Sequence, residues 1–160
     1  MKRKTAVMFA VLATLAVSLG TSASARVAAP CTAANGSPIS KSLSICVGQI
    51  AAFKGKPGTN VRVTIMLASM TGHPVTNVRV VDILPKGVKP LSSNRPYKLV
   101  NGRPTWVVRS VSNLQFYRFT ARTPANAKPG SHWYNVVTAG PVGGKISRSG
   151  PSLVQYLPSN

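Results

Sequence analysis

The sequence of 160 residues predicts an all-β protein, a β-sandwich of seven to eight antiparallel strands in a single domain. Short runs rich in β-branched and aromatic residues recur at intervals of about 8–12 residues, with glycine, proline or asparagine between them. Several of these runs alternate between apolar and polar residues, which is the period of a half-buried strand. No amphipathic helical pattern of useful length competes with this interpretation.

The stretch over residues 60–87 carries the clearest pattern. Within residues 60–69, the aliphatic side chains share one face of the expected strand: Val61, Val63, Ile65 and Leu67. Residues 70–74, which contain Gly72 and Pro74, provide a turn, and a second β-branched run begins at Val75. We therefore expect these two runs to form an antiparallel pair with each other.

The second run stops at a structural turn that contains Asp82, Pro85 and Gly87. Pro85 fixes its own φ, and Gly87 permits the chain to reverse. We expect the Asp82 carboxylate to accept backbone N–H groups of this turn, or to pair with a nearby arginine.

The other strands follow in order. Residues 45–53 predict a first short strand, and residues 88–96, which two prolines interrupt, predict a loop or an irregular edge. Asn101-Gly102, between residues 97–100 and 105–108, is the strongest short-range signal of a hairpin, because a type I′ turn needs positive φ at both central positions. Residues 115–122, 132–139 and 153–157 predict the later strands. Arg109 shares the parity of Val107 and Val111, so we expect a bend or bulge there.

The first 25 residues have the three-part layout of a secretory signal peptide. A basic cap (Lys2, Arg3 and Lys4) precedes an apolar run over residues 6–19, and residues 23–25 offer a cleavage site of small side chains. The apolar run is shorter than the roughly 18 residues of a membrane span. We expect a signal peptide over 1–25, an N-terminal arm over 26–47, the sandwich over 48–157 and a tail over 158–160. The mature protein would be secreted, extracellular or associated with the cell envelope, without a transmembrane span.

Cys31 and Cys46 are the only two cysteines. An even count in an exported chain predicts a disulfide between them. The bridge would close a loop of about 15 residues, for which the chain-entropy estimate is about 3 kcal/mol. It would tie the arm to the first strand, and neither histidine has the spacing to the cysteines that a zinc site needs.

The charge of the chain is strongly unbalanced, with 20 lysine and arginine residues against one acidic residue. Four arginines have the parity opposite to the aliphatic positions of their strands, so we expect them on outer faces as a polyanion-binding surface: Arg62, Arg79, Arg118 and Arg122. Candidate partners are anionic cell-envelope polymers, lipid headgroups, extracellular nucleic acid and acidic polysaccharide. The alternative is that the charge reflects adaptation to a medium, such as an acidic one, in which few carboxylates are favoured.

The chain carries no recognisable catalytic or cofactor motif. One aspartate and no glutamate exclude catalysis by paired carboxylates. No Gly-x-Ser-x-Gly elbow supports a triad, and no phosphate loop, zinc spacing or calcium loop is present. We therefore expect a non-enzymatic protein with no cofactor, no metal and no dedicated small-molecule substrate.

Around the Asp-x-Leu-Pro-x-Gly step, the chain resembles the bacterial conserved repeat domain, also called domain of unknown function number eleven. The resemblance covers residues 49–156 and rests on these residues: Thr71-Gly72, Asn77-Val78, Asp82, Leu84-Pro85, Gly87, Trp106, Pro124, Gly130 and Asn135. The chain departs from the family at Ser69, where asparagine is usual, and in its near lack of acids. The resemblance implies an immunoglobulin-like sandwich that serves as a stalk, spacer or adhesive module, usually in tandem copies.

Two function classes follow. The first is an exported, non-catalytic β-sandwich with a structural or adhesive role, attached to anionic polymers through a diffuse cationic surface. The second is a polysaccharide- or nucleic-acid-binding module in which Trp106, Trp133 or Tyr134 stack on the ligand while Arg118 and Arg122 contact its charges. The salt dependence of binding distinguishes the two classes. Moderate ionic strength abolishes diffuse attachment, whereas a stacking site keeps its selectivity among ligands.

Overall fold

The computed structural model describes residues 43–51, 54–149 and 152–156. The predicted signal peptide, most of the predicted arm and the predicted tail lie outside these residues. The described residues contain strands and no helix, so no helix among them could cross a membrane.

Eight of the described strands have five or more residues: β1 (Ile45–Ala51), β3 (Asn60–Ser69), β4 (Val75–Ile83), β5 (Lys89–Ser93), β7 (Arg103–Val111), β8 (Gln115–Arg122), β9 (His132–Pro141) and β11 (Ser152–Tyr156). Three are shorter: β2 (Lys54–Gly55), β6 (Lys98–Val100) and β10 (Ser147–Arg148). β1 begins at Ile45, so the last residues of the predicted arm belong to the sandwich.

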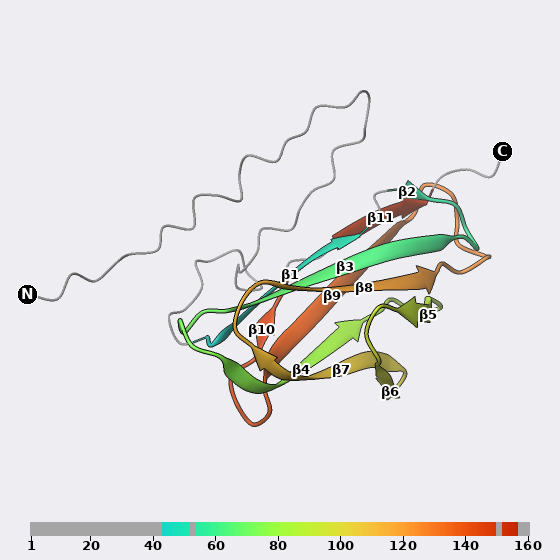
Figure 1. Ribbon diagram of the computed structural model, residues 1–160. Helices are drawn as coiled ribbons and strands as arrows, with labels where there is room; N and C mark the ends of the chain where they lie inside the picture. The colour runs from blue at the N-terminus through green and yellow to red at the C-terminus, as the bar shows by residue number, and fades with distance from the viewer. Residues whose placement is uncertain (1–42, 52–53, 150–151, 157–160) are drawn as a thin grey trace, which may run out of the picture.

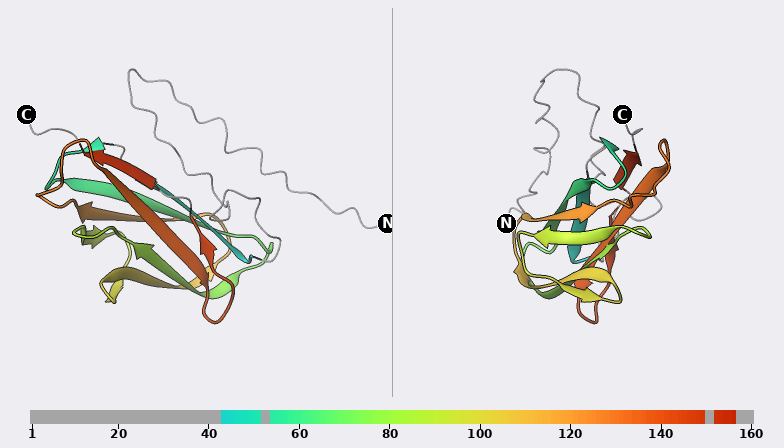
Figure 2. Two further views of the ribbon diagram at one scale, coloured as in Figure 1. Left: turned by 180° about the vertical axis from the view of Figure 1, so that it is seen from behind. Right: turned by 90° about the vertical axis from the view of Figure 1, so that its right-hand side faces the viewer.

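Two sheets pack face to face in this structure (Figures 1 and 2). The first sheet has the strand order β1-β3-β8-β5. The second has the order β2-β11-β9-β4-β7-β6, with β10 beside β9. Neighbouring strands run antiparallel, except for the short parallel pair of β2 and β11. The protein is an immunoglobulin-like β-sandwich, which confirms the predicted fold class.

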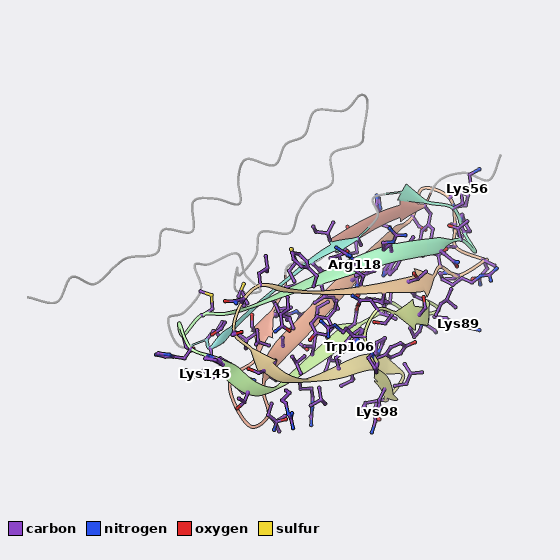
Figure 3. All side chains as sticks on the ribbon, viewed as in Figure 1. Lys56, Lys89, Lys98, Trp106, Arg118 and Lys145 are labelled. Carbon is purple, nitrogen blue, oxygen red and sulfur yellow. The ribbon has the colours of Figure 1, made fainter. Side chains whose placement is uncertain are left out.

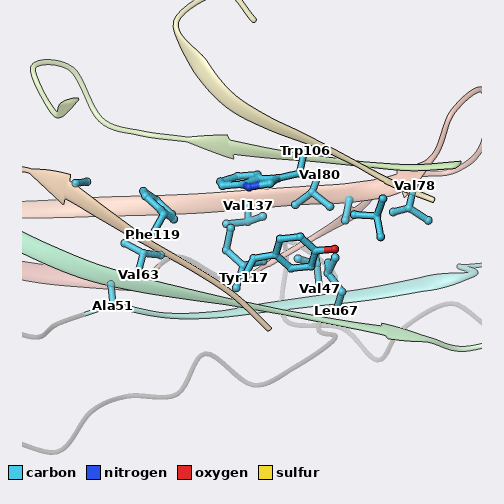
Figure 4. Close-up of a cluster of buried hydrophobic side chains, with 14 of the residues drawn as sticks. Val47, Ala51, Val63, Leu67, Val78, Val80, Trp106, Tyr117, Phe119 and Val137 are labelled. Atoms are coloured by element: carbon cyan, nitrogen blue, oxygen red, sulfur yellow. The ribbon is translucent and has the colours of Figure 1, made fainter. Parts of the chain in front are cut away.

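The core lies between the sheets and follows the alternation of the sequence (Figure 4). Aliphatic side chains of β1 and β3 face those of β4 and β9. The Trp106 ring is 1% exposed and lies 5.6 Å from Tyr97, 6.2 Å from Tyr117 and 5.8 Å from Phe119 between ring centroids. Its indole N–H donates to the Arg95 carbonyl at 3.3 Å, which satisfies the polar atom of this buried ring.

The predicted pairing of β3 with β4 is wrong, because the two strands lie in different sheets. β3 pairs with β1 and β8, whereas β4 pairs with β7 and β9. In the connection between them, the hydroxyls of Ser69 and Thr71 donate to the His73 carbonyl at 2.6 and 3.0 Å. Alternation is the same whether successive strands are hydrogen-bonded or stacked across a core. The short connection therefore carries the chain from one layer to the other.

The predicted irregularities are present. In β7, Val108 and Val111 are both buried while Arg109 is exposed, so the strand changes face between the two valines. The ladder to β4 omits the pair of Asn77 and Arg109 but keeps its register on both sides, and Asn77 has a φ of 54°. This is the bend that the parity of Arg109 predicts.

The predicted hairpin also forms. Asn101 and Gly102 have φ values of 51° and 72°, the positive values that a type I′ turn requires, and they join β6 to β7. Among the described strands, β5 pairs only with β8, and its register shifts between Pro90 and Ser92, which confirms an irregular edge.

Candidate polyanion-binding surface

The lysine and arginine side chains whose exposure the structure describes are all exposed. They are Lys56, Arg62, Arg79, Lys86, Lys89, Arg95, Lys98, Arg103, Arg109, Arg118, Arg122, Lys128, Lys145 and Arg148. The labelled cations in Figure 3 point outward from several sides of the sandwich, while Trp106 lies between its layers. The only acidic side chain of the protein, Asp82, is fully buried. The described surface therefore presents basic side chains without a carboxylate side chain to neutralise them.

Three of the four predicted arginines lie together on the outer face of the first sheet. Arg62 on β3 is opposite Thr120 on β8, and Arg118 is opposite Thr64 two residues further along the ladder. Diagonal neighbours in a ladder are about 7–8 Å apart, so both guanidinium groups can reach one ligand. The Arg122 Nε donates to the Gly58 carbonyl at 3.1 Å. We call the surface of Arg62, Thr64, Arg118, Thr120 and Arg122 the β3–β8 face.

A hollow of about 260 Å³ lies on this face, beside Arg62 and Arg118. Ser92, Ser93 and Asn94 line its other side. The Asn94 side-chain oxygen accepts the Arg118 backbone N–H at 2.8 Å, and the Asn94 N–H donates to the Arg118 carbonyl at 2.9 Å. These bonds hold the end of β5 against β8. Guanidinium and hydroxyl groups at one hollow are suited to bind phosphate, carboxylate or sugar oxygens.

Arg79 does not belong to this group. It lies on β4 in the second sheet, opposite Val107 on β7 and Gly140 on β9. The predicted set of four arginines is therefore divided between the outer faces of the two layers. Alternation assigns a side chain to the inside or outside of its sheet, but it does not tell which sheet the strand joins.

The structure does not assemble the predicted aromatic stacking site. Trp106 and Trp133 are 1% and 2% exposed, so neither ring is open to a ligand. Tyr134 is 58% exposed, but it lies on β9 in the second sheet, whereas Arg118 and Arg122 lie in the first. The two tryptophans share the inward parity of their strands, which favours core packing over ligand contact.

Pro85 and Gly87 lie in a turn, as expected from the sequence. The Pro85 carbonyl accepts the Val88 N–H at 3.2 Å, and Gly87 has a φ of 83°. Asp82 does not take part in this turn, contrary to the prediction. Its side chain has the inward parity of Val80 and is 0% exposed. A carboxylate on the inner face of β4 points into the core and away from the turn that follows the strand.

Asp82 belongs to a buried polar cluster that connects the two sheets and that sequence reasoning missed. Asn135 on β9 donates through Nδ2 to Oδ2 of Asp82 at 3.4 Å and to Oε1 of Gln49 on β1 at 3.0 Å. The Gln49 amide donates in turn to the Asn135 carbonyl. All three residues are 0% exposed. Their inward parity in the sequence is the one signal that could have located them.

Burial governs the protonation of this cluster. It raises the pKa of Asp82 from 3.8 to about 8, and the hydrogen bond from Asn135 opposes the shift without overcoming it. A carboxyl group with this pKa is predominantly neutral at pH 7, because a low-dielectric core disfavours its charged form. The protein therefore keeps its single acid as an uncharged group inside the sandwich.

The cysteines and histidines form no metal centre in the part of the chain that the structure describes. Cys46 on β1 is buried and disulfide-bonded. Its predicted partner, Cys31, lies outside the described residues, so the pairing of these two cysteines stays a prediction.

No family model and no curated protein matches the chain. A variant of BcpA, the major pilin subunit of Bacillus cereus, superposes with a TM-score of 0.53 and 10% sequence identity, over 70% of this chain and 40% of the pilin chain. A second BcpA structure superposes with a TM-score of 0.49 and 11% identity, over 69% of this chain and 41% of the pilin chain. The collagen-binding domain of a Staphylococcus aureus adhesin superposes with a TM-score of 0.41 and 12% identity, over 66% of this chain and 95% of the domain.

The chain thus spans about two fifths of the length of the pilin subunits that it resembles. At 10% identity, the likeness to the first pilin structure shows a shared β-sandwich fold. The resemblance to the conserved repeat domain stays a prediction.

Proposed function

We propose that this protein is an exported, non-catalytic β-sandwich of the cell envelope or extracellular space, with a structural or adhesive role, and that its cationic surface attaches to anionic polymers. One observation carries the proposal. The lysine and arginine side chains that the structure describes are all exposed, while the only acidic side chain, Asp82, is buried. Such a surface attracts polyanions over several ångströms and releases their counterions on contact.

The β3–β8 face is the preferred point of attachment. Its three arginines project from adjacent strands of a hydrogen-bonded sheet, so their spacing is set by the ladder. Arginine binds phosphate and carboxylate groups in a two-pronged geometry that lysine lacks. The hollow beside Arg62 and Arg118 adds hydroxyl and amide groups that can contact the uncharged part of a polymer repeat.

The structural or adhesive role draws support from the fold. Two sheets enclose an aromatic and aliphatic core, and both outer faces remain open to solvent over much of their strands. A pilin subunit is a protein of similar fold. A rigid module with an adhesive outer face is the use of such a fold that fits this charge distribution.

The test is binding to polyphosphate and to polyglutamate, measured by calorimetry over graded NaCl concentrations. Wild-type protein should bind both, and the logarithm of the affinity should fall linearly with the logarithm of salt concentration. The triple change Arg62→Gln, Arg118→Gln and Arg122→Gln should weaken binding and reduce the salt slope by about three.

The matched control is Arg109→Gln, Lys145→Gln and Arg148→Gln, which removes the same charge from the second sheet and its hairpin. It should weaken binding less than the first variant. Equal losses in the two variants would contradict attachment at the β3–β8 face. Absence of polyanion binding at low salt would overturn the proposed function itself.

A further inference from the structure

One aromatic side chain lies at the end of the β3–β8 face. Phe116 on β8 has the outward parity of Arg118 and Arg122, and it is 42% exposed. The ring contacts of the described residues gather around Trp106 in the core, and none of them involves Phe116. The Phe116 ring is therefore open to a ligand, in contrast to the two buried tryptophans.

The register of the ladder determines what surrounds this ring. Phe116 is opposite Met66 on β3, and the next outward position along β8 is Arg118. Two residues of a strand span about 7 Å, so the first guanidinium group is close to the ring. The two outward pairs that follow contain Arg62 and Arg122 in turn. A ligand that covers this surface thus meets one apolar end and then a series of cations.

This layout fits a polymer that carries a flat ring beside each anionic group. A strand of nucleic acid has this design, because every nucleotide has one base and one phosphate. Stacking of a base on an aromatic ring tolerates any sequence, since every base has a π-face. Guanidinium groups bind phosphate oxygens through paired N–H donors.

Other anionic polymers match the face less completely. Polyphosphate and polyglutamate have no ring to cover Phe116. The hydroxyl groups of an acidic polysaccharide need acceptors as well as donors, but phenylalanine and arginine side chains accept no hydrogen bond, and the only carboxyl group of the protein is buried. In a nucleic-acid duplex the bases are stacked inside the helix, where the Phe116 ring does not reach them. A single strand is the polymer that uses both the ring and the cations.

The lengths of the side chains favour a flexible strand over a lipid surface. Arg62 and Arg118 project from the same sheet face as Phe116, and an arginine side chain is longer than a phenylalanine side chain. A flat anionic membrane would therefore meet the guanidinium groups before it reached the ring. A single strand can turn one base down onto the ring while its phosphates remain at the level of the guanidinium groups.

We propose that the β3–β8 face binds single-stranded nucleic acid. One base stacks on Phe116, and the phosphates of neighbouring nucleotides contact Arg118, Arg62 and Arg122. The proposal rests on the proposed attachment to anionic polymers and names the polymer. It also assigns the stacking role to a ring other than the three that the sequence suggests.

The test is fluorescence anisotropy of the full chain with two labelled strands of about ten nucleotides, one of oligothymidine and one of abasic residues. The two strands carry the same number of phosphates, and only the first has bases to stack. Wild-type protein should bind oligothymidine at least about tenfold more tightly than the abasic strand.

The variant Phe116→Leu keeps an apolar side chain and removes the ring. It should weaken oligothymidine binding by about tenfold and leave its salt slope unchanged, because no charge is lost. The matched change Tyr134→Leu removes a ring that is 58% exposed on the second sheet, and it should leave both affinities unaltered. Unchanged far-ultraviolet circular dichroism verifies that both variants are folded.

Equal affinity of the wild type for the two strands, or equal losses in the two ring variants, would overturn the proposal. So would binding to anionic phospholipid vesicles that depends on Phe116 without a preference for oligothymidine, since that result identifies a membrane as the partner. Polyphosphate binding together with equal affinity for the two strands overturns the stacking alone. Absence of any polyanion binding at low salt overturns the proposed function as well, so the two failures are distinguishable.

Discussion

Asp82 and Asn135 place polar groups on the inner faces of β4 and β9, where their neighbours are apolar side chains such as Val80, Trp133 and Val137. Three buried polar atoms in the described part of the chain have no hydrogen-bond partner: Oδ1 of Asp82, Oδ1 of Asn135 and Nε1 of Trp133. Unpartnered polar atoms are costly in a core, and an ionised carboxylate is far more costly than a neutral one. The proton on Asp82 is therefore part of what stabilises the folded state.

This proton makes stability depend on pH in a defined direction. The pKa of Asp82 rises from an ordinary value of 3.8 to about 8 on folding, so the folded protein binds more protons between these values. Its contribution to the free energy of unfolding is fully present below about pH 4 and is lost as the pH rises towards 8. We expect the urea midpoint to fall markedly between pH 5 and pH 8, as measured by circular dichroism.

The variant Asp82→Asn isolates this effect, because an amide of similar shape carries no titrating proton. It should flatten the fall in the urea midpoint and should exceed the wild-type midpoint at pH 8. Thr120→Ala on the outer face serves as the control, with an unchanged pH dependence. A wild-type protein that becomes more stable as the pH rises from 5 to 8 would contradict a buried, protonated Asp82.

In β9, Gly140 is packed closely against the backbone of the hairpin that follows the strand. A Cβ added at Gly140 would lie 2.5 Å from the Lys145 carbonyl oxygen and 3.1 Å from the Ile146 Cα. Both neighbours are backbone atoms, so they cannot move aside as a flexible side chain would. Gly140→Ala should lower the free energy of unfolding by about 1–3 kcal/mol, measured by urea denaturation.

Thr138→Ala, two residues earlier on β9, is the matched control and should have a much smaller effect. The loss in Gly140→Ala should be accompanied by amide shifts in residues 141–146, where the hairpin must move. Equal stability of the Gly140 variant and the wild type would show that the hairpin does not pack against Gly140.

The elements are predictable to the extent that local patterns determine them. Alternation locates β3 and β8 to the residue, and Asn101-Gly102 locates the hairpin, because both signals depend on neighbours in the sequence. The partner of each strand is not predictable in this way. The predicted pairing of β3 with β4 is wrong, and Arg79 lies in a different sheet from Arg62, because sheet membership depends on contacts between segments far apart in the chain.

The candidate site shows the same division. Outward parity correctly places Arg62 and Arg118 on a solvent-facing surface. The buried cluster of Gln49, Asp82 and Asn135 escapes notice in the sequence because its members come from three strands. A turn motif gives Asp82 a plausible local role, and only the packing of the sheets shows its actual one.

Across the whole sandwich, the chain passes repeatedly from one sheet to the other. Of the ten connections between consecutive described strands, seven lead from one sheet to the other. Neither sheet is therefore built from one continuous segment of the chain. Trp106 and Trp133 are both buried in the core, so their fluorescence reports on the packing of the two sheets against each other.

We expect a single unfolding transition in which both sheets are lost together. Tryptophan fluorescence and far-ultraviolet circular dichroism should give the same urea midpoint and the same slope. Two separated transitions, or a fluorescence change that precedes the loss of strand signal, would show that the layers unfold independently.

The position of β11 has a consequence for how the protein is made. This last described strand pairs with β9 and with β2, so it closes the sheet that carries most of the strands. While the ribosome is still adding residues before 152, the second layer lacks that strand and the first layer has an incomplete cover. The complete ladder of β9 can therefore form only after almost all of the described chain has been synthesised.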